Sequence, residues 1–513
     1  MIKKLRKICT LSACIFASVA AFSGCGAKEN VEGTVEISML QAGYGVEFME
    51  NAIRDFNKIY PDVEIKLTPI VNLSSDTIEG ELTSKDNGVD LYLSTYLPWQ
   101  KYINGDGTSD YLEDLTEFFD EKPLGEGENL SIREKMLPDY LKQTELHSKN
   151  WVMNWANGPT GLIVNKKALG DRRIPRTSNE MLEIFQQISA EEKAETDKKK
   201  KIYPLIWPGE AWDYWRYVLN VWWAQYEGTD AYSRFWQLKD EDGELSPSVY
   251  LQDGILQALE ELESILAYEY SYPGSAALPH TDAQAQFMLN RAAFTVSGDW
   301  IESEMTHFKN QDIRLIKTPV NSALGEKLGI SETQLRAAVD AIDNNEEKPS
   351  GIDGETFEQI KTARAVQFNI GYQHFMFIPK NSNAKEETKL FIRFLTSQAS
   401  MEQTYVTSGM TLPYITAGSD RFVLSESNFQ KLTEYKKDLY EIEKTMNYIS
   451  FDYTSPLRWK AGIQQFYGPA NQPELIFSQQ NENMRKSARQ VWLDEYATVN
   501  GSWQSYLSTA GLG

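Results

Sequence analysis

The sequence is poor in cysteine and histidine. Only three of its 513 residues are cysteine (Cys9, Cys14 and Cys25), and all three lie within the first 25 positions. The rest of the chain therefore has no thiol for a disulfide, a thiolate zinc site or a cysteine nucleophile. The four histidines are scattered, with no pair at metal-ligand spacing. We expect no metal and no cofactor, and a fold that rests on its hydrophobic core alone.

Positive charge is also scarce. The formal net charge is −22, and Lys198–Lys201 is the only run of four basic residues. An acidic surface of this kind repels nucleic acid and acidic lipid. We therefore expect no nucleic-acid partner and no electrostatic adhesion to a membrane.

Long apolar runs are missing except at the start. A basic segment at 1–7 precedes Ile8–Ala21, an apolar run of about 14 residues that suits a signal peptide and is too short for a spanning helix. The run ends in Phe22-Ser23-Gly24-Cys25, which resembles the bacterial lipobox, in which two small residues precede a lipid-modified cysteine. We predict a lipoprotein signal peptide at 1–24, lipidation at Cys25 and a tether at 25–33. The protein would then lie on the extracytoplasmic face of the cell membrane, and an ordinary secretory signal is the alternative.

The length after residue 24 exceeds one compact core of ordinary size, so two or three domains or lobes are expected. Val35–Leu40 alternates as a strand, Glu47–Tyr60 has the apolar spacing of a helix, and Val63–Leu67 follows as a strand. A β-α-β unit implies a parallel sheet, so the pattern predicts an α/β fold.

Two further stretches have a helical pattern. One helix is predicted near Leu112–Phe119. An acidic helical insertion is predicted at 322–362, where Ser331 and Gln334 have the spacing of a capping box.

Catalytic motifs are absent. The sequence contains no Gly-x-Ser-x-Gly, no phosphate-binding loop and no His-Glu-x-x-His. Carboxylates are so abundant that a pair at glycosidase spacing would arise by chance. The acidic stretch Asp240–Glu244 lacks the spacing of a calcium loop, so a solvated loop is expected there. We predict that the protein is not an enzyme.

Five segments recur in the order and spacing of a known family. They are Val35–Leu67, Leu162–Lys167, Pro175–Ile188, Ala293–Trp300 and Phe377–Leu395. Together they resemble the family 1 extracellular solute-binding proteins of carbohydrate-importing ABC transporters, the family that contains maltose-binding protein. Ser178 stands where that family usually has tryptophan. The chain is also longer than typical members, with extra residues around 105–144 and 322–362.

The resemblance implies a two-lobed, type II periplasmic-binding-protein-like fold, in which each lobe is a mainly parallel sheet flanked by helices. Lobe one would hold 34–155 plus 375–412, and lobe two 156–374 plus 413–513. It implies a monomer that captures a carbohydrate, expected to be an oligosaccharide, between lobes that close, and delivers it to a permease. A solute-binding protein for a non-sugar ligand, such as a lipid-linked or phosphorylated compound, is the alternative. A surface glycosidase or an adhesin is a third possibility.

A sugar offers C–H faces on which aromatic rings stack, and hydroxyls that carboxylates and amides bind. Candidate ligand-binding residues are therefore aromatic or acidic residues in loops after strands or at expected crossings, and for Trp300 and Trp459 also at positions where relatives supply a ring: Tyr44, Trp99, Trp155, Trp207, Trp212, Asp299, Trp300, Tyr372 and Trp459. Each also has a plain packing or capping explanation. Trp212, Trp215, Trp222 and Trp223 recur at roughly helical spacing, which is more typical of a buried helix face than of a binding surface.

Overall fold

The computed structural model describes residues 31–41, 43–71, 73–84, 87–94, 97–211, 213–308, 312–463, 467 and 471–513. Cys25, the signal peptide predicted at 1–24 and the candidate Trp212 lie outside these residues. The chain folds into two compact units, one made of Met1–Ala156 and Gln373–Lys431, the other of Asn157–Tyr372 and Leu432–Gly513. We call them unit 1 and unit 2 and describe each by itself.

The expected lobe boundaries near 155 and 374 lie within two residues of the observed ones, whereas residues 413–431 pack with unit 1. The reason is backbone pairing. The N–H of Leu137 donates to the carbonyl of Pro413 at 2.9 Å, and the N–H of Ile415 donates to the carbonyl of Lys135 at 2.8 Å.

Unit 1 is built on one five-stranded sheet with the order β2-β1-β3-β12-β6. Its strands are β1 Gly33–Leu40, β2 Val63–Ile70, β3 Leu91–Leu93, β6 Met153–Asn154 and β12 Phe375–Phe377, with a separate pair β4 Glu145–Leu146 and β5 Lys149–Asn150. Its helices are α1 Glu47–Ile59, α2 Ser75–Thr83, α3 Ile132–Lys135, α4 Pro138–Gln143, α15 Lys385–Leu395, α16 Gln398–Ser408 and α17 Glu426–Phe429.

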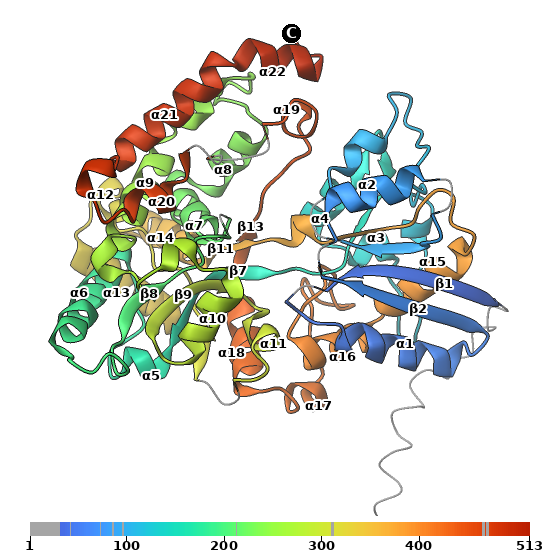
Figure 1. Cartoon of the computed structure of the whole chain (residues 1–513), viewed down its shortest axis with the longest axis horizontal. Helices are drawn as coiled ribbons and strands as arrows, with labels where there is room; N and C mark the ends of the chain where they lie inside the picture. Colours follow the sequence, from blue (N-terminus) through green and yellow to red (C-terminus); the bar gives the residue numbers. More distant parts are fainter. Residues whose placement is uncertain are drawn as a thin grey trace, which may run out of the picture. The chain divides into compact units, whose positions relative to one another are not determined.

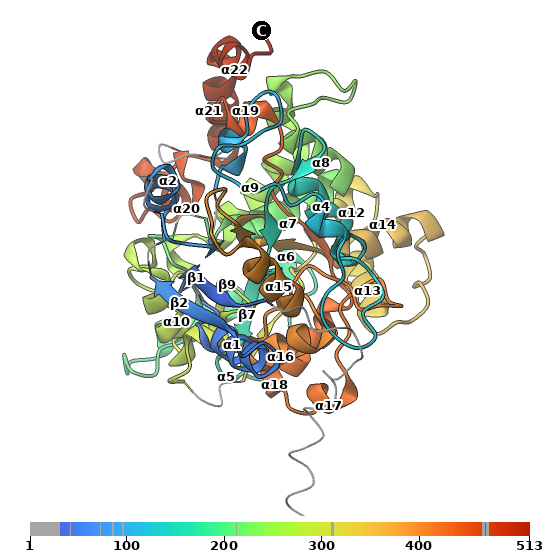
Figure 2. The same ribbon diagram turned by 90° about the vertical axis from the view of Figure 1, so that its right-hand side faces the viewer.

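Strand β1 pairs in parallel with β2 and β3, and β12 pairs antiparallel with β3 and β6. Helices α1 and α16 lie on one face of this sheet and α2 on the other (Figures 1 and 2). Side chains alternate between the two faces along a strand. On the α2 face, the rings of Tyr92 and Phe377 stack at 5.1 Å, and on the α1 face Phe56 contacts Phe391 at 5.1 Å.

The helix predicted near Leu112–Phe119 is wrong except for a short 3₁₀ turn, Phe118–Asp120. The segment is extended because its backbone pairs with distant residues. The N–H of Glu113 donates to the carbonyl of Ile378 at 3.0 Å, and that of Leu115 donates to the carbonyl of Asn150 at 2.9 Å.

Unit 2 contains a six-stranded sheet with the order β13-β11-β7-β9-β8, and β10 pairs with β7. Its strands are β7 Pro159–Asn165, β8 Tyr203–Ile206, β9 Ala292–Gly298, β10 Ile313–Leu315, β11 Val366–Asn369 and β13 Asn447–Ile449. Its helices are α5 Lys166–Leu169, α6 Ser178–Ala194, α7 Arg216–Glu227, α8 Thr229–Trp236, α9 Asp253–Ile265, α10 His280–Met288, α11 Ile301–Glu304, α12 Ala323–Lys327, α13 Glu332–Asp343, α14 Gly354–Ala365, α18 Glu434–Glu443, α19 Pro456–Trp459, α20 Pro473–Phe477, α21 Ala488–Gly501 and α22 Trp503–Ala510.

The two faces of this sheet pack against different helices. Ile206 belongs to a buried cluster with residues of α10, α11 and α18. Its strand neighbour Leu205 points the opposite way, toward Val218 of α7 and Leu262 of α9. Trp222 and Trp223 of α7 are fully buried, which confirms the prediction of a buried helix face.

The segment predicted as a helical insertion contains α12, α13 and α14, which share a buried apolar cluster of their own. The capping box predicted from Ser331 and Gln334 is confirmed, because each side chain binds the other residue's backbone N–H at the start of α13. The insertion is therefore a small helical layer built onto unit 2.

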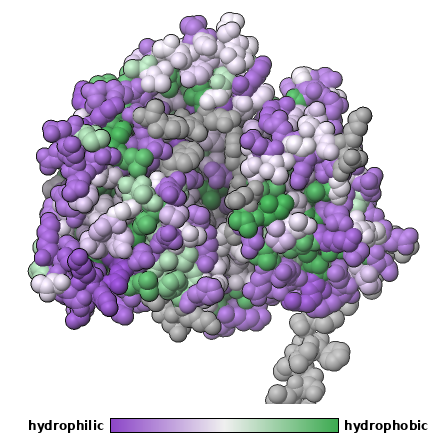
Figure 3. Space-filling model, viewed as in Figure 1, coloured by the Kyte–Doolittle hydropathy of each residue, from purple (hydrophilic) through white to green (hydrophobic). Residues whose placement is uncertain are grey.

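The α/β class expected from the sequence is confirmed: both units have a sheet flanked by helices. The face of the molecule in Figure 3 is hydrophilic over most of its area, in line with the excess of acidic residues. None of the described helices combines the length and the apolar character that crossing a bilayer requires.

Candidate ligand-binding site

In unit 1, four strand ends meet at one edge of the sheet. β1 and β3 are parallel, so their carboxyl ends share an edge, and the antiparallel pairings bring the start of β12 and the end of β6 to the same edge. The residues just beyond these ends are Tyr44, Ser94, His374 and Trp155. We call these four residues the aromatic edge of unit 1. The carboxyl edge of an α/β sheet is where such folds place their ligands.

The rings of this edge contact one another. Trp155 lies 4.8 Å from His374 and 6.2 Å from Tyr44, ring centre to ring centre, in edge-on arrangements. Its indole N–H donates to the carbonyl of Ser94 at 2.9 Å. Phe48 of α1 stacks parallel to Trp155 at 6.3 Å. Two of the predicted residues, Tyr44 and Trp155, are thus brought together by the fold.

His374 was not among the predicted site residues. It is buried, and burial lowers the pKa of its imidazole to about 3, so the ring is neutral at physiological pH. Within the described part of the chain, its Nδ1 has no hydrogen-bond partner. In the sequence, only the position of His374 at the start of a predicted strand could have indicated that it belongs to a site.

In unit 2, an equivalent edge forms around β9. β8 is parallel to β9, so Trp207 and Asp299 follow strands that end together. β7 pairs antiparallel with both β9 and β11, so β9 and β11 end at the same edge, and the parallel pairing of β11 with β13 brings β13 there too. Tyr372 and Tyr453 follow the ends of β11 and β13. We call the residues after these strand ends, with Trp300, the aromatic edge of unit 2.

Trp300 holds a defined position there. Its ring lies against Gly298, the last residue of β9, where a side chain would have no space. Tyr214 and Tyr217, which precede and begin α7, present their rings edge-on to it at 6.4 Å and 6.3 Å. The backbone N–H of Asp299 donates to the carbonyl of Pro159 at 2.9 Å and fixes the turn between strand and ring.

The rings continue along the edge. Tyr217 stacks with Phe368 at 6.0 Å, and Phe368 contacts Phe451 at 4.9 Å. Phe451 in turn contacts Tyr372 at 4.8 Å, and Tyr372 contacts Tyr453 at 5.5 Å. The predicted residues Trp300 and Tyr372 thus belong to one chain of rings. Its intermediate members, Tyr217, Phe368 and Phe451, were missed from the sequence because they come from three separate segments.

The polar groups around Tyr214, whose ring contacts Trp300, are mainly acidic. Asp213 is half-buried, and burial raises the pKa of its carboxyl group. His280, whose ring stacks with Tyr214 at 6.1 Å, lies with Nε2 3.5 Å from Oε1 of Glu304. The hydrogen bond to Glu304 raises the pKa of His280. The carboxylates of Asp213 and Glu304 can accept hydrogen bonds from the hydroxyl groups of a ligand.

The remaining candidates are engaged in packing or lie away from the rings of the two edges. Trp99 is fully buried in the core of unit 1, among residues that include Tyr92 and Phe377, so its ring has a packing role. Trp207 is buried, and its indole N–H donates to the hydroxyl of Ser271 at 3.1 Å. Trp459 is half-buried at the end of α19. Among the described residues, no group of three histidines, cysteines or carboxylates is placed to hold a metal ion.

Comparison with known proteins agrees with this architecture. Residues 51–433 match the family model described as bacterial extracellular solute-binding protein, in the group numbered 8 rather than the group 1 named from the sequence. No curated protein sequence matches the chain.

Solved structures share the fold at low identity. One, from a study of xylan utilization by Caldanaerobius polysaccharolyticus, is 12% identical with a TM-score of 0.60, over 91% of this chain and 100% of the other. RafE in complex with raffinose is 13% identical with a TM-score of 0.57, over 91% and 99%. Maltose-bound MalE3 of T. maritima is 14% identical with a TM-score of 0.54, over 91% and 99%.

Proposed function

Because the chain belongs to the bacterial extracellular solute-binding proteins and serves an ABC transporter rather than catalysing a reaction, we propose that its solute is a carbohydrate, specifically an oligosaccharide. The protein captures this sugar outside the cytoplasm and delivers it to the transporter's permease.

The observation that carries the proposal is the position of Trp300. Its ring follows a strand end directly and is held flat against Gly298, with two tyrosine rings beside it. Aromatic rings placed in this way stack on the C–H faces of sugars, while neighbouring carboxylates accept hydrogen bonds from hydroxyls. The aromatic edge of unit 1 supplies a second set of rings, led by Trp155 and Tyr44.

The similar structures support the same ligand class. Their descriptions mention raffinose, maltose and a chitin oligosaccharide. All are only 13–15% identical to this chain, so they support a class of ligand and not one particular sugar.

A phosphorylated ligand, the alternative considered from the sequence, fits the edge of unit 2 poorly. Asp299 and Glu304 are close to Trp300 in sequence. Asp213 directly precedes Tyr214, whose ring contacts Trp300, and Glu304 pairs with His280, whose ring stacks with Tyr214. Carboxylates disfavour a phosphate in a site that excludes water.

We also propose that Cys25 carries a lipid that tethers the protein beside its permease, which raises the effective concentration for docking. Cys25→Ala is then expected to release the exported protein from the membrane fraction while sugar binding is retained. Membrane retention of the processed variant would contradict the anchor.

Isothermal titration against raffinose, maltotriose, xylotriose and chitotriose tests the carbohydrate proposal. At least one sugar is expected to bind, and Trp300→Ala to weaken it by about tenfold or more, because a stacked ring contributes on the order of 1 kcal/mol beyond its buried area. Trp300→Phe, which keeps a ring, serves as the matched control and is expected to lose less. Binding of a peptide or a polyamine with no response to any sugar would refute the proposal.

A further inference from the structure

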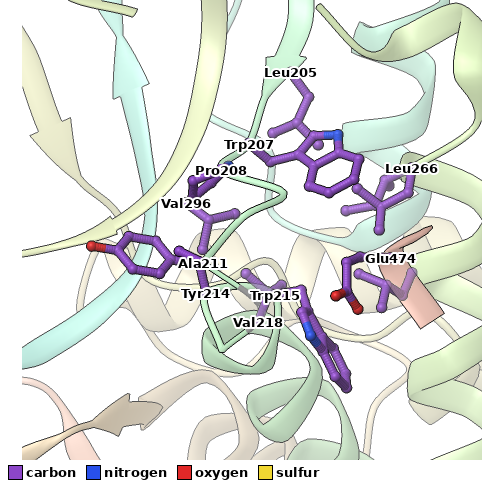
Figure 4. A pocket seen from close by; sticks show the side chains of 12 residues that line it. Leu205, Trp207, Pro208, Ala211, Tyr214, Trp215, Val218, Leu266, Val296 and Glu474 are labelled. Atoms are coloured by element: carbon purple, nitrogen blue, oxygen red, sulfur yellow. The ribbon is translucent and has the colours of Figure 1, made fainter. Parts of the chain in front are cut away.

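A small cavity lies inside unit 2 between the sheet and helices α7 and α9. It is lined mainly by apolar side chains of β8, α7, α9 and the segment between β8 and α7, which includes Trp207, Tyr214 and Trp215. Glu474 of α20 also lines it (Figure 4). Its volume is about 10 Å³. That is about the space that one water molecule needs.

Among the described residues that line the cavity, Glu474 of α20 is the only charged one. It is 1% exposed, and within the described part of the chain neither carboxyl oxygen has a hydrogen-bond partner. Burial raises the pKa of Glu474 to about 8. A buried carboxyl group without partners costs free energy, so its presence in an apolar wall calls for a partner.

Trp215 brings a second polar group to the same cavity. It is 5% exposed, and its indole N–H has no acceptor among the described residues. In Figure 4 the carboxyl group of Glu474 points toward the indole of Trp215. By contrast, the N–H of Trp207 is already satisfied by Ser271.

These two groups define the chemistry of the occupant. An indole N–H only donates, whereas a carboxyl group accepts and, when protonated, also donates. We propose that this cavity binds one hydroxyl group, which accepts a hydrogen bond from Trp215 and exchanges one with Glu474.

Other occupants fit less well. A cation has no lone pair for the indole N–H, and an apolar group leaves both polar groups unsatisfied. The size of the cavity excludes anything larger than one hydroxyl or a similar group at its centre. The hydroxyl belongs either to a buried water or to the bound carbohydrate, and the second source rests on the proposed function. In that case Glu474 also helps to determine sugar specificity.

Thermal unfolding of ligand-free protein at pH 6 tests the site without reference to any sugar. Glu474→Leu removes the carboxyl group at similar volume and strands the hydroxyl and Trp215, so the melting temperature is expected to fall by roughly 2–4 °C or more. Glu474→Gln, the matched control that still donates and accepts, is expected to lose clearly less. A Glu474→Leu variant that melts at or above the wild-type temperature would show an empty cavity and overturn the proposal.

Trp215→Phe provides a second measurement because it deletes the N–H and keeps a ring. Glu474→Leu combined with Trp215→Phe is expected to lose less than the sum of the two single losses, since the shared hydroxyl couples them. If the loss in melting temperature of the double variant equals the sum of the two single losses, Glu474 and Trp215 do not share a hydroxyl, and the proposal fails.

Crystal structures identify the source of the hydroxyl. Density between Glu474 and Trp215 in sugar-free crystals marks a water, and replacement of that density by a sugar oxygen in crystals grown with raffinose marks a ligand hydroxyl. A cavity that is empty in both crystals refutes the site. If no sugar binds at all, the carbohydrate proposal fails. The sugar-free crystal still shows whether the cavity holds a water, and so still tests the hydroxyl site.

Discussion

The ring of Trp300 lies directly against the backbone of Gly298, two residues earlier in the chain. A Cβ atom added at Gly298 would lie 2.1 Å from Cζ3 of this ring, far inside van der Waals contact. The absence of a side chain at the end of β9 is therefore what allows the indole to lie flat at the strand end.

Gly298→Ala is accordingly expected to displace Trp300 and to weaken sugar binding about as much as Trp300→Ala, in a titration calorimeter. Gly80→Ala is the matched control, because no atom lies within 4 Å of its added Cβ and the site is inside helix α2. That control is expected to leave affinity unchanged and to stabilise unit 1 by about 0.5–1 kcal/mol. Unchanged affinity in Gly298→Ala would contradict the role given to Trp300.

The buried imidazole of His374 predicts a pH dependence. The pKa of His374 is about 3 in the folded chain, whereas an unperturbed histidine, as in the unfolded chain, has a pKa of 6.5. Between these two pH values the unfolded chain therefore binds more protons than the folded chain. Stability is therefore expected to fall as the pH drops from about 6.5 toward 3, by up to about 1.4 kcal/mol per pH unit.

His374→Phe, which keeps a ring beside Trp155, is expected to remove this part of the slope in urea unfolding measured between pH 7.5 and 5. The exposed His307→Gln variant serves as the control and should keep the wild-type profile. An unchanged slope in His374→Phe would show that the imidazole is not held neutral.

Arg458 is expected to stabilise unit 2 through hydrogen bonds to backbone carbonyls rather than through an ion pair. Its fully buried guanidinium donates to the carbonyls of Phe235 at 2.7 Å, Trp236 at 3.1 Å and Ile463 at 3.0 Å. It thereby satisfies the carbonyl end of α8.

Arg458→Met leaves these carbonyls without donors and is expected to cost about 3 kcal/mol in urea unfolding. Arg458→Lys should recover only part of this, because one ammonium cannot reproduce the planar fork of donors. Arg421→Met, at an exposed arginine, is the control and should change stability by less than about 0.5 kcal/mol. Equal stabilities of the two methionine variants would contradict this role.

Lys135 forms an ion pair with Glu128 inside the extra segment around 105–144 and links this segment to Thr396 at the end of α15. Nζ of Lys135 lies 2.9 Å from Oε2 of Glu128 and also donates to the carbonyl of Thr396 at 2.9 Å. Both side chains are almost completely buried. Lys135→Met alone therefore leaves an uncompensated carboxylate and is expected to cost about 3–5 kcal/mol.

The double variant Lys135→Met/Glu128→Gln is expected to be more stable than Lys135→Met, because the stranded charge is gone. A double-mutant cycle by chemical denaturation should give a coupling of about 1–3 kcal/mol. Additivity within about 0.5 kcal/mol would show that the two groups act independently.

Local hydrogen bonding explains what could be predicted from the sequence. Ser331 and Gln334 cap α13 through neighbouring backbone groups, so three residues of spacing were sufficient. The β-α-β pattern of Val35–Leu67 and the strand before Trp300 likewise depend on apolar periodicity within single segments. The α/β class and the position of one ring at a strand end followed from such local patterns.

Tertiary structure alone decided the rest. Leu112–Phe119 has helical spacing, yet strand-like pairing with Ile378 and Asn150 satisfies its backbone instead. His374 meets Trp155 because β12 pairs with β6 across more than two hundred residues of chain, and Tyr217 meets Trp300 because α7 packs on the sheet. Glu474 and Trp215 share a cavity for the same reason: partners distant in sequence are brought together by burial and strand pairing, which leave no periodic trace in either segment.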